Sequence, residues 1–136
     1  MGTWSFEPFG NDTAGDWAFG MDEAKDLSYI EAALDAVLEQ DTDDELEATD
    51  SEEAIAACEV LAKLLGKGTQ SDSYTQGVDT WVASLKLKPD TALLKKAQKA
   101  LKRVAGKNSE LRELWEEEGA DDWKKSIKAL RTALDG

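Results

Sequence analysis

The sequence predicts an all-α protein: a compact single domain of about seven helices over residues 1–136, with an aromatic-rich N-terminal arm. Three observations predict this fold class. Apolar residues recur three and four positions apart along most of the chain, which is the period of an amphipathic helix. Helix-starting and helix-ending residues stand at the borders of these segments. No segment combines period-two alternation with the β-branched residues typical of a strand.

The N-terminal segment predicts an arm followed by the first helix. The first ten residues have no helical period and are rich in aromatic side chains, which rarely stay in water, so we expect the arm to lie over the core. Asn11 or Asp12 is expected to cap a helix that runs to about Glu23. Trp17 and Met21 stand four positions apart and therefore share one face of this helix.

Two further helices are predicted before the middle of the chain. Ser28 and Glu31 form a capping box that opens the second helix, which ends near Gln40. Overlapping capping boxes in residues 49–53 open the third helix, and Gly66 ends it. The apolar positions of these two helices are Ile30, Leu34, Val37, Leu38, Ile55, Cys58, Leu61, Leu64 and Leu65.

Four helices are predicted in the C-terminal half. A polar loop over residues 66–73 precedes the fourth helix, which Pro89 closes. Asp90 is expected to cap the fifth helix, which carries five basic residues and is followed by Gly106. The two remaining helices are expected to start at Asn108 or Ser109 and at Asp121, with Gly119 between them.

The negative charge of the chain is concentrated in one part of the sequence. Residues 1–85 contain 3 basic and 20 acidic residues, a net charge of −17, whereas residues 86–136 carry +4. Between Lys25 and Lys63 there are 13 acidic residues and no basic one. Such a field repels phosphates, so nucleic acid and anionic membranes are not expected as partners.

We expect the acidic segment to bind a basic protein partner, because clustered carboxylates attract a basic surface and speed its association. The alternative is an acidic face that serves only solubility and is partly neutralised by the basic fifth helix. The residues predicted to bind the partner are Asp35, Glu39, Asp41, Asp43, Asp44, Glu45 and Glu47.

No catalytic apparatus is recognisable in the sequence. The chain has no histidine, which excludes histidine-dependent triads and the usual acid–base residue at neutral pH. Its single cysteine, Cys58, has small apolar neighbours at helical spacing and is expected to be buried and inert. We therefore expect neither an enzyme nor a cofactor; a cleft with several carboxylates of raised pKa would favour an enzyme instead.

A calcium site is the other interpretation of the acidic run. Four acids match loop positions 1, 3, 5 and 12 of an EF-hand: Asp41, Asp43, Glu45 and Glu52. Position 6, which needs glycine for a sharp turn, is Leu46. Because chance matches are frequent in so acidic a run, we expect no metal site.

The compartment follows from the absence of targeting signals. No window approaches the length of uninterrupted apolar sequence that a membrane span needs, and the N-terminus lacks the basic and apolar regions of a secretory signal. Phe6 stands where a myristoylation motif beginning at Met1-Gly2 requires serine or threonine. We expect a cytoplasmic protein with no lipid anchor.

Four motifs spread over nearly the whole chain carry a family resemblance. They are Met1-Gly2-x-Trp4 with Pro8-Phe9-x-Asn11-Asp12 and Ala14, Asp16 and Trp17; Leu27-Ser28-x-Ile30-Glu31-x-Ala33-Leu34; the Glu/Ala-rich helix 53–65; and Ser109-Glu110-Leu111-Arg112-Glu113-Leu114-Trp115-Glu116-Glu117. With these motifs the chain resembles the bacterial family called domain of unknown function 4259. The resemblance implies a helical bacterial protein without assigned catalytic residues, and some members look like immunity proteins encoded beside toxins.

The N-terminal motif has a structural and a functional interpretation. Packing and helix capping account for its residue types, so we expect a structural role for Trp4, Phe9, Asn11, Asp12, Asp16 and Trp17. The alternative is an arm that forms a lip against a partner. For the whole chain we expect a non-catalytic, immunity-type inhibitor that occludes a basic toxin, and the alternative is a structural or housekeeping helical protein.

Overall fold

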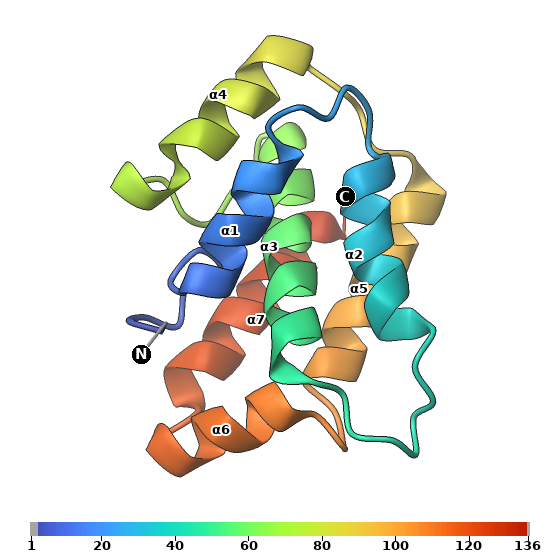
Figure 1. The fold of residues 1–136 in the computed structure, drawn as a ribbon, viewed down its shortest axis with the longest axis vertical. Coiled ribbons are helices and arrows are strands. Elements are labelled where there is room, and N and C mark those ends of the chain that lie inside the picture. The colour runs from blue at the N-terminus through green and yellow to red at the C-terminus, as the bar shows by residue number, and fades with distance from the viewer. Residues whose placement is uncertain (1–2, 136) are drawn as a thin grey trace.

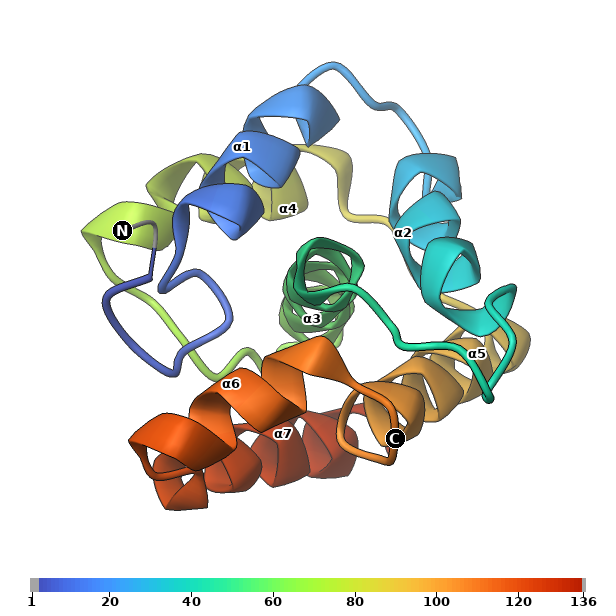
Figure 2. The same cartoon turned by 60° about the horizontal axis from the view of Figure 1, so that its bottom comes forward.

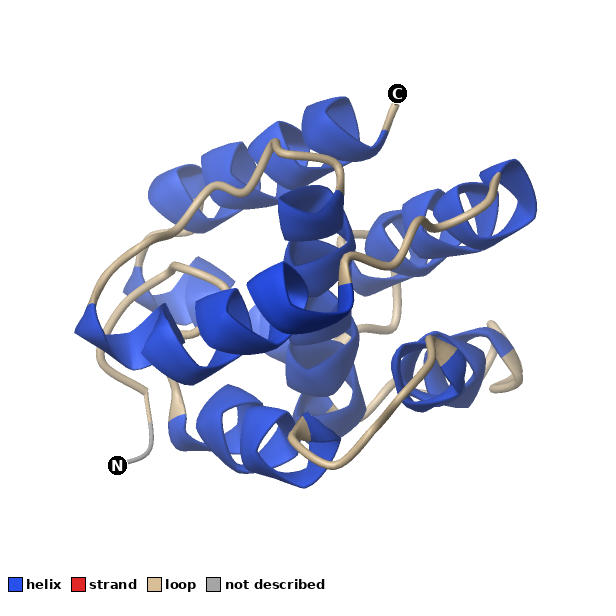
Figure 3. Ribbon diagram, turned by 90° about the horizontal axis from the view of Figure 1, so that it is seen from above, coloured by secondary structure: helices blue, strands red, loops and turns tan. Residues whose placement is uncertain are grey.

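A computed structural model describes residues 3–135 of the chain. Within these residues it contains seven α-helices, one short 3₁₀ helix and no strand, which confirms the all-α fold class (Figure 3). Two isolated β-bridges join Thr3 to Asn11 and Leu46 to Ser109. No helix in residues 3–135 is long and apolar enough to cross a membrane. Met1 and Gly2, which open the N-terminal motif, lie outside the described residues.

The predicted order of helices is confirmed. The elements are α1 (Asp12–Met21), α2 (Ser28–Leu38), α3 (Ala48–Leu64), the 3₁₀ helix η1 (Ser73–Thr75), α4 (Gln76–Leu85), α5 (Thr91–Val104), α6 (Glu110–Glu118) and α7 (Asp121–Leu134) (Figure 1).

Helix α3 forms the centre of the molecule. It contacts each of the other six α-helices, and Figure 2 shows it nearly end-on inside the ring that they form. The sequence predicts only one buried face, with Ile55, Cys58 and Leu61, whereas every residue from 54 to 62 is buried. The reason is composition, because a helix that is small or apolar on all sides is best placed in the core. Glu59 is the one charged residue in this stretch.

The caps that depend on nearby residues are confirmed. The side chains of Asn11, Asp90 and Ser109 accept hydrogen bonds from backbone N–H groups in the first turns of α1, α5 and α6. Gly66, with φ of +76°, follows the end of α3 as predicted. This left-handed conformation suits glycine and satisfies the end of the helix.

Two predicted capping boxes are wrong. Ser28 is the first residue of α2, and its N–H and hydroxyl donate to Oδ1 of Asp26 at 2.9 and 2.6 Å. Helix α3 begins at Ala48, without a side-chain cap from residues 49–53. Instead, the Ala48 N–H donates to Oε1 of Glu110 in α6 at 2.8 Å. A carboxylate from another helix thus replaces the expected local cap.

The N-terminal arm covers the core only in part. Phe9 is buried, and its N–H donates to Oε1 of Gln70 at 2.8 Å. Trp4 and Phe6, by contrast, are 48% and 41% exposed, which corrects the expectation that the aromatic side chains of the arm leave water. The Trp4 ring lies against Tyr74, with 5.1 Å between ring centroids. The arm is therefore anchored at Phe9 and leaves aromatic surface beyond it.

Candidate binding surface

The structure divides the predicted partner-binding residues between two settings. Asp35 lies on α2 and forms an ion pair with Lys96 of α5 at 2.8 Å, and Glu31 pairs with the same ammonium group at 2.7 Å. The hydrogen bonds that Lys96 donates to Asp35 and Glu31 raise its pKa. The charge of Asp35 is therefore partly neutralised by a base of the same chain. This is what we expect if the acidic face serves only solubility.

The other predicted residues lie in the α2–α3 connection and are exposed: Glu39, Asp41, Asp43, Asp44, Glu45 and Glu47. This connection is fixed on the link between α5 and α6. The buried Leu46 donates its N–H to the Asn108 carbonyl at 2.7 Å and accepts from the Glu110 N–H at 3.0 Å. Arg103 of α5 donates to the Asp44 carbonyl at 2.9 Å. The carboxylates thus project from an anchored backbone.

The acids of this connection meet acids of α6, which sequence reasoning missed. A hydrogen bond between the Glu45 and Glu113 carboxyl groups raises the pKa of Glu45, and the charges of Glu113 and Glu110 add to the effect. Glu110 and Glu113 belong to the net-positive part of the sequence, so a charge count along the chain does not join them to the acidic segment. We call Asp41, Asp43, Asp44, Glu45, Glu47, Glu110 and Glu113 the acidic face.

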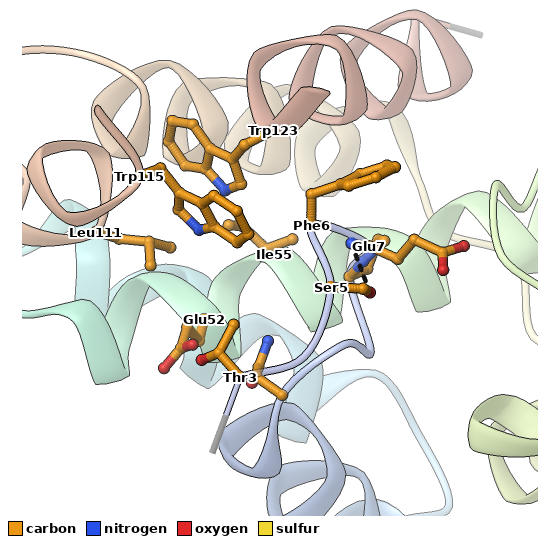
Figure 4. A pocket seen from close by; sticks show the side chains of 11 residues that line it. Thr3, Ser5, Phe6, Glu7, Glu52, Ile55, Leu111, Trp115 and Trp123 are labelled. Carbon is orange, nitrogen blue, oxygen red and sulfur yellow. Dashed lines mark hydrogen bonds between the residues drawn. The ribbon is translucent and has the colours of Figure 1, made fainter. Parts of the chain in front are cut away.

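A groove lies beside the acidic face, between the N-terminal arm and α6. It has a volume of about 680 Å³, and we call it the arm–α6 groove. Its apolar wall is formed by Trp4, Phe6, Leu111, Leu114 and Trp115, and its acids are Glu52, Glu117 and Glu118. Figure 4 shows a small adjoining pocket that shares Phe6, Trp115 and Glu52 with the groove; in it Trp115 and Trp123 lie together near Ile55, and Glu52 lies beside Thr3.

Glu52 is the carboxylate that the structure places in this groove from the central helix. Burial raises its pKa, a hydrogen bond with Thr13 opposes this shift, and the charge of Glu110 adds to it. Within residues 3–135, no ion pair involves Glu52, Glu110 or Glu113. A cation brought to this place would therefore be attracted by charge that no internal base neutralises.

A second carboxylate, that of Glu59, lies toward the C-terminal end of α3 and is completely buried. Its oxygens accept from the Thr69 N–H at 2.8 Å, the Thr69 hydroxyl at 2.7 Å and the Gln70 N–H at 2.8 Å. Lys63, at 3.8 Å from Glu59, also pairs with Asp79 at 2.7 Å. Burial raises the pKa of Glu59, while these donors oppose the shift.

The Glu59 cluster was not predicted, although a signal existed. A single acid inside an otherwise apolar stretch of helix must either be exposed or find partners. Here the polar loop 66–73 folds back to supply them, and it joins α3 to α4 and, through Gln70, to the arm. Because all its donors come from the fold itself, this cluster is a structural element.

The sequence also made predictions about Cys58 and about a calcium site. Cys58 is buried, and burial raises the pKa of its thiol, which fits the predicted inert role. The calcium hypothesis requires the side chains of Asp41, Asp43, Glu45 and Glu52 to surround one ion. In the part of the chain that the structure describes, no group of three or more acidic or cysteine side chains is placed to hold a metal ion.

A family model described as Domain of unknown function (DUF4259) matches residues 2–126. The chain belongs to this family. The DUF4259 match includes the arm, α1 to α6 and the first part of α7, so both the arm–α6 groove and the Glu59 cluster lie within it. No curated protein and no solved structure matches the chain. Its function must therefore be argued from the surface itself.

Proposed function

We propose that this DUF4259 protein is a non-catalytic, cytoplasmic inhibitor that binds a basic protein partner through the acidic face, as a bacterial immunity protein binds a toxin. One observation supports this proposal above all. Carboxyl groups from the α2–α3 connection and from α6 meet at Glu45 and Glu113, where a hydrogen bond between the two groups and repulsion from Glu113 and Glu110 raise the pKa of Glu45. Such repulsion opposes folding, and a basic partner would relieve it.

The proposed mechanism is occlusion aided by electrostatic attraction. Exposed carboxylates on an anchored backbone speed the encounter with a basic surface and disfavour acidic competitors. The bound protein would then cover the partner's functional surface. No group on this chain needs to react.

An enzyme would need more than the arm–α6 groove offers. Glu52 is the carboxylate of raised pKa among its lining residues, whereas Glu45 and Glu59, whose pKa values are also raised, lie outside that lining. A single carboxylate of this kind supports binding of a cation better than paired acid–base chemistry. We therefore propose binding without catalysis.

The test compares two variants with the same change of charge. In the first, Asp41, Asp43, Asp44, Glu45 and Glu47 become Asn or Gln, which keeps the hydrogen-bond acceptor at Asp41 for the Asp43 N–H. In the control, five exposed acids elsewhere are changed in the same way: Asp16, Asp22, Glu23, Asp122 and Asp135. Each protein is used to capture partners from a lysate of the source organism, and the captured protein is purified for affinity and activity assays.

We expect the wild-type and control proteins to retain the same basic partner and to inhibit its activity. The acidic-face variant should bind it at least about tenfold more weakly, with a reduced dependence on salt. Equal capture by both variants contradicts the proposal. So does a bound partner whose activity is unchanged, which would favour the structural or housekeeping alternative.

A further inference from the structure

The exposed apolar side chains of the protein are concentrated at one place. Five large hydrophobic residues are exposed in residues 3–135, and three of them line the arm–α6 groove: Trp4, Phe6 and Leu114. A fourth, Tyr74, lies against Trp4. Only Phe19, on α1, stands apart from this group. A grouping of apolar surface within a groove is typical of a binding site rather than of scattered exposure.

The charge of the groove restricts what can occupy it. Its lining contains Glu52, Glu117 and Glu118 and, among the described residues, no lysine or arginine. A second groove, between the α2–α3 connection and α5, is different because Lys99, Lys102, Arg103 and Lys107 line it together with Asp43. The arm–α6 groove thus joins apolar walls to unneutralised carboxylates, a combination that fits an apolar side chain beside a cation.

From these observations we infer that the arm–α6 groove binds a segment of the basic partner in which a bulky apolar residue is flanked by lysine or arginine. This inference rests on the proposed function and adds a second contact to it. The apolar residue packs between Trp4, Phe6 and Leu114, while the flanking cations approach Glu52 and Glu117. A volume of about 680 Å³ is enough for one or two large side chains.

Charge also argues against other occupants. A second copy of this chain would bring a net charge of −13 toward an acidic groove, and anionic lipid headgroups would be repelled in the same way. A basic segment is attracted by the groove and by the acidic face beside it. The acidic face then guides the partner, and the groove anchors it.

The inference can be tested before the partner is known, with synthetic peptides and the full chain. The first peptide has the central sequence Lys-Arg-Phe-Leu-Lys-Arg. In the second, alanine replaces Phe and Leu, and in the third, glutamate replaces every lysine and arginine. Affinity is measured by calorimetry and by the fluorescence of the tryptophans. We expect the first peptide to bind at least about tenfold more tightly than the second, and the third not to bind.

Two variants locate the binding in the groove. Trp4→Ala and Leu114→Ala remove exposed side chains, so both proteins should fold, and each should weaken the first peptide about fivefold or more. Phe19→Ala is the matched control, because Phe19 is 84% exposed and lies outside the groove lining. It should leave the affinity unchanged. Thermal unfolding of all three variants confirms that the fold is retained.

Several results would overturn the inference. Equal affinity for the first two peptides would mean that charge alone determines binding. Equal effects of Leu114→Ala and Phe19→Ala would place binding elsewhere. A dimer in sedimentation experiments that Leu114→Ala dissociates would assign the groove to a second copy of the chain.

The inference and the proposed function fail in different ways. If the acidic-face variant loses the natural partner while Trp4→Ala retains it, the inhibitor stands and the groove assignment fails. If the groove binds the first peptide but no inhibited basic partner is captured, the groove stands and the inhibitor fails.

Discussion

The two ends of the central helix hold the same type of residue in opposite settings. Glu59, toward the end of α3, is completely buried and accepts hydrogen bonds from Thr69 and Gln70, with Lys63 beside it. Glu52, about two turns earlier, is partly exposed, has one hydrogen bond with Thr13 and faces the charge of Glu110. A carboxylate whose hydrogen-bond donors are supplied by the fold has a structural role. A carboxylate with few such donors can bind a ligand.

The difference arises from the segments that cover each end. The loop after α3 comes close enough to Glu59 that a Cβ on Gly68 would lie 3.4 Å from Oε2 of Glu59 and 2.6 Å from Cγ of Lys63. Over Glu52, the arm and α6 stand apart and leave the arm–α6 groove. The comparison therefore predicts that changes at Glu59 affect stability, whereas changes at Glu52 affect binding.

The largest effect is expected from Glu59→Ala. The substitution leaves the buried Gln70 N–H and the Thr69 N–H and hydroxyl without their acceptor, and Lys63 with less compensation. We expect the free energy of unfolding to fall by about 3–5 kcal/mol, as for other broken buried charge pairs. Urea denaturation followed by circular dichroism measures this loss.

The matched control for Glu59→Ala is Glu52→Ala, the same change on the same helix. It should lower the free energy of unfolding by no more than about 1 kcal/mol, because Glu52 has fewer partners to leave unsatisfied. Similar losses at both positions would mean that the two ends of α3 do not differ in the way proposed.

A smaller loss is expected from Lys63→Met, which tests whether the cation or the backbone donors hold Glu59. Methionine keeps the apolar length of the side chain but removes the ammonium group that pairs with Asp79 and donates to the Gln70 carbonyl. Glu59 keeps its bonds from Thr69 and Gln70, so we expect a loss of about 2 kcal/mol in chemical denaturation. A loss greater than that of Glu59→Ala would show that Lys63 is the dominant partner.

Helix order was predictable because its signals are local. The apolar period lies within each helix, and the caps at Asn11, Asp90 and Ser109 involve residues only a few positions away. The capping box expected at residues 49–53 was wrong because Glu110, distant in sequence, bonds to the Ala48 N–H. Nothing in the sequence around α3 indicates that competitor.

The site was predictable in composition but not in arrangement. Counting charges along the chain identified the acids of the α2–α3 connection, including Glu45. Glu45 lies near Glu113 because Leu46 pairs with the α5–α6 link. The groove exists because the arm and α6 stand apart. Both are consequences of tertiary packing. The exposure of Trp4 was missed for the same reason.

Gly68→Ala tests how closely the loop must cover Glu59. The added methyl group would lie 2.6 Å from Cγ of Lys63, so Lys63 must shift away from its partners or the loop must rise. We expect a loss of about 1–2 kcal/mol in the free energy of unfolding, in the range of overpacked substitutions. Gly77→Ala is the control, since its Cβ meets nothing within 4 Å in α4. That variant should be as stable as the wild type or up to about 0.5 kcal/mol more stable.

The smallest effect on stability is expected from Glu52→Gln, and it is best seen as a change in pH dependence. Burial raises the pKa of Glu52 in the folded protein above its usual value of 4.5, so the folded state holds this proton more strongly than the unfolded state. The contribution of Glu52 to stability therefore increases as the pH falls through the folded pKa, and it is lost as the pH rises again. Glutamine cannot titrate. When the pH is lowered from about 7 to about 5, the melting temperature of the variant should therefore rise less than that of the wild type.

Net charge must be separated from the local effect of Glu52. Asp16→Asn removes one charge from an exposed position on α1, so it reports the relief of general repulsion alone. If Glu52→Gln and Asp16→Asn change the pH profile equally, the groove does not perturb Glu52. If only Glu52→Gln makes the melting temperature less dependent on pH, the raised pKa of Glu52 arises from its own surroundings. The same variant should then weaken the basic, apolar peptide, because a carboxylate that is costly in the free protein is the one that a bound cation stabilises most.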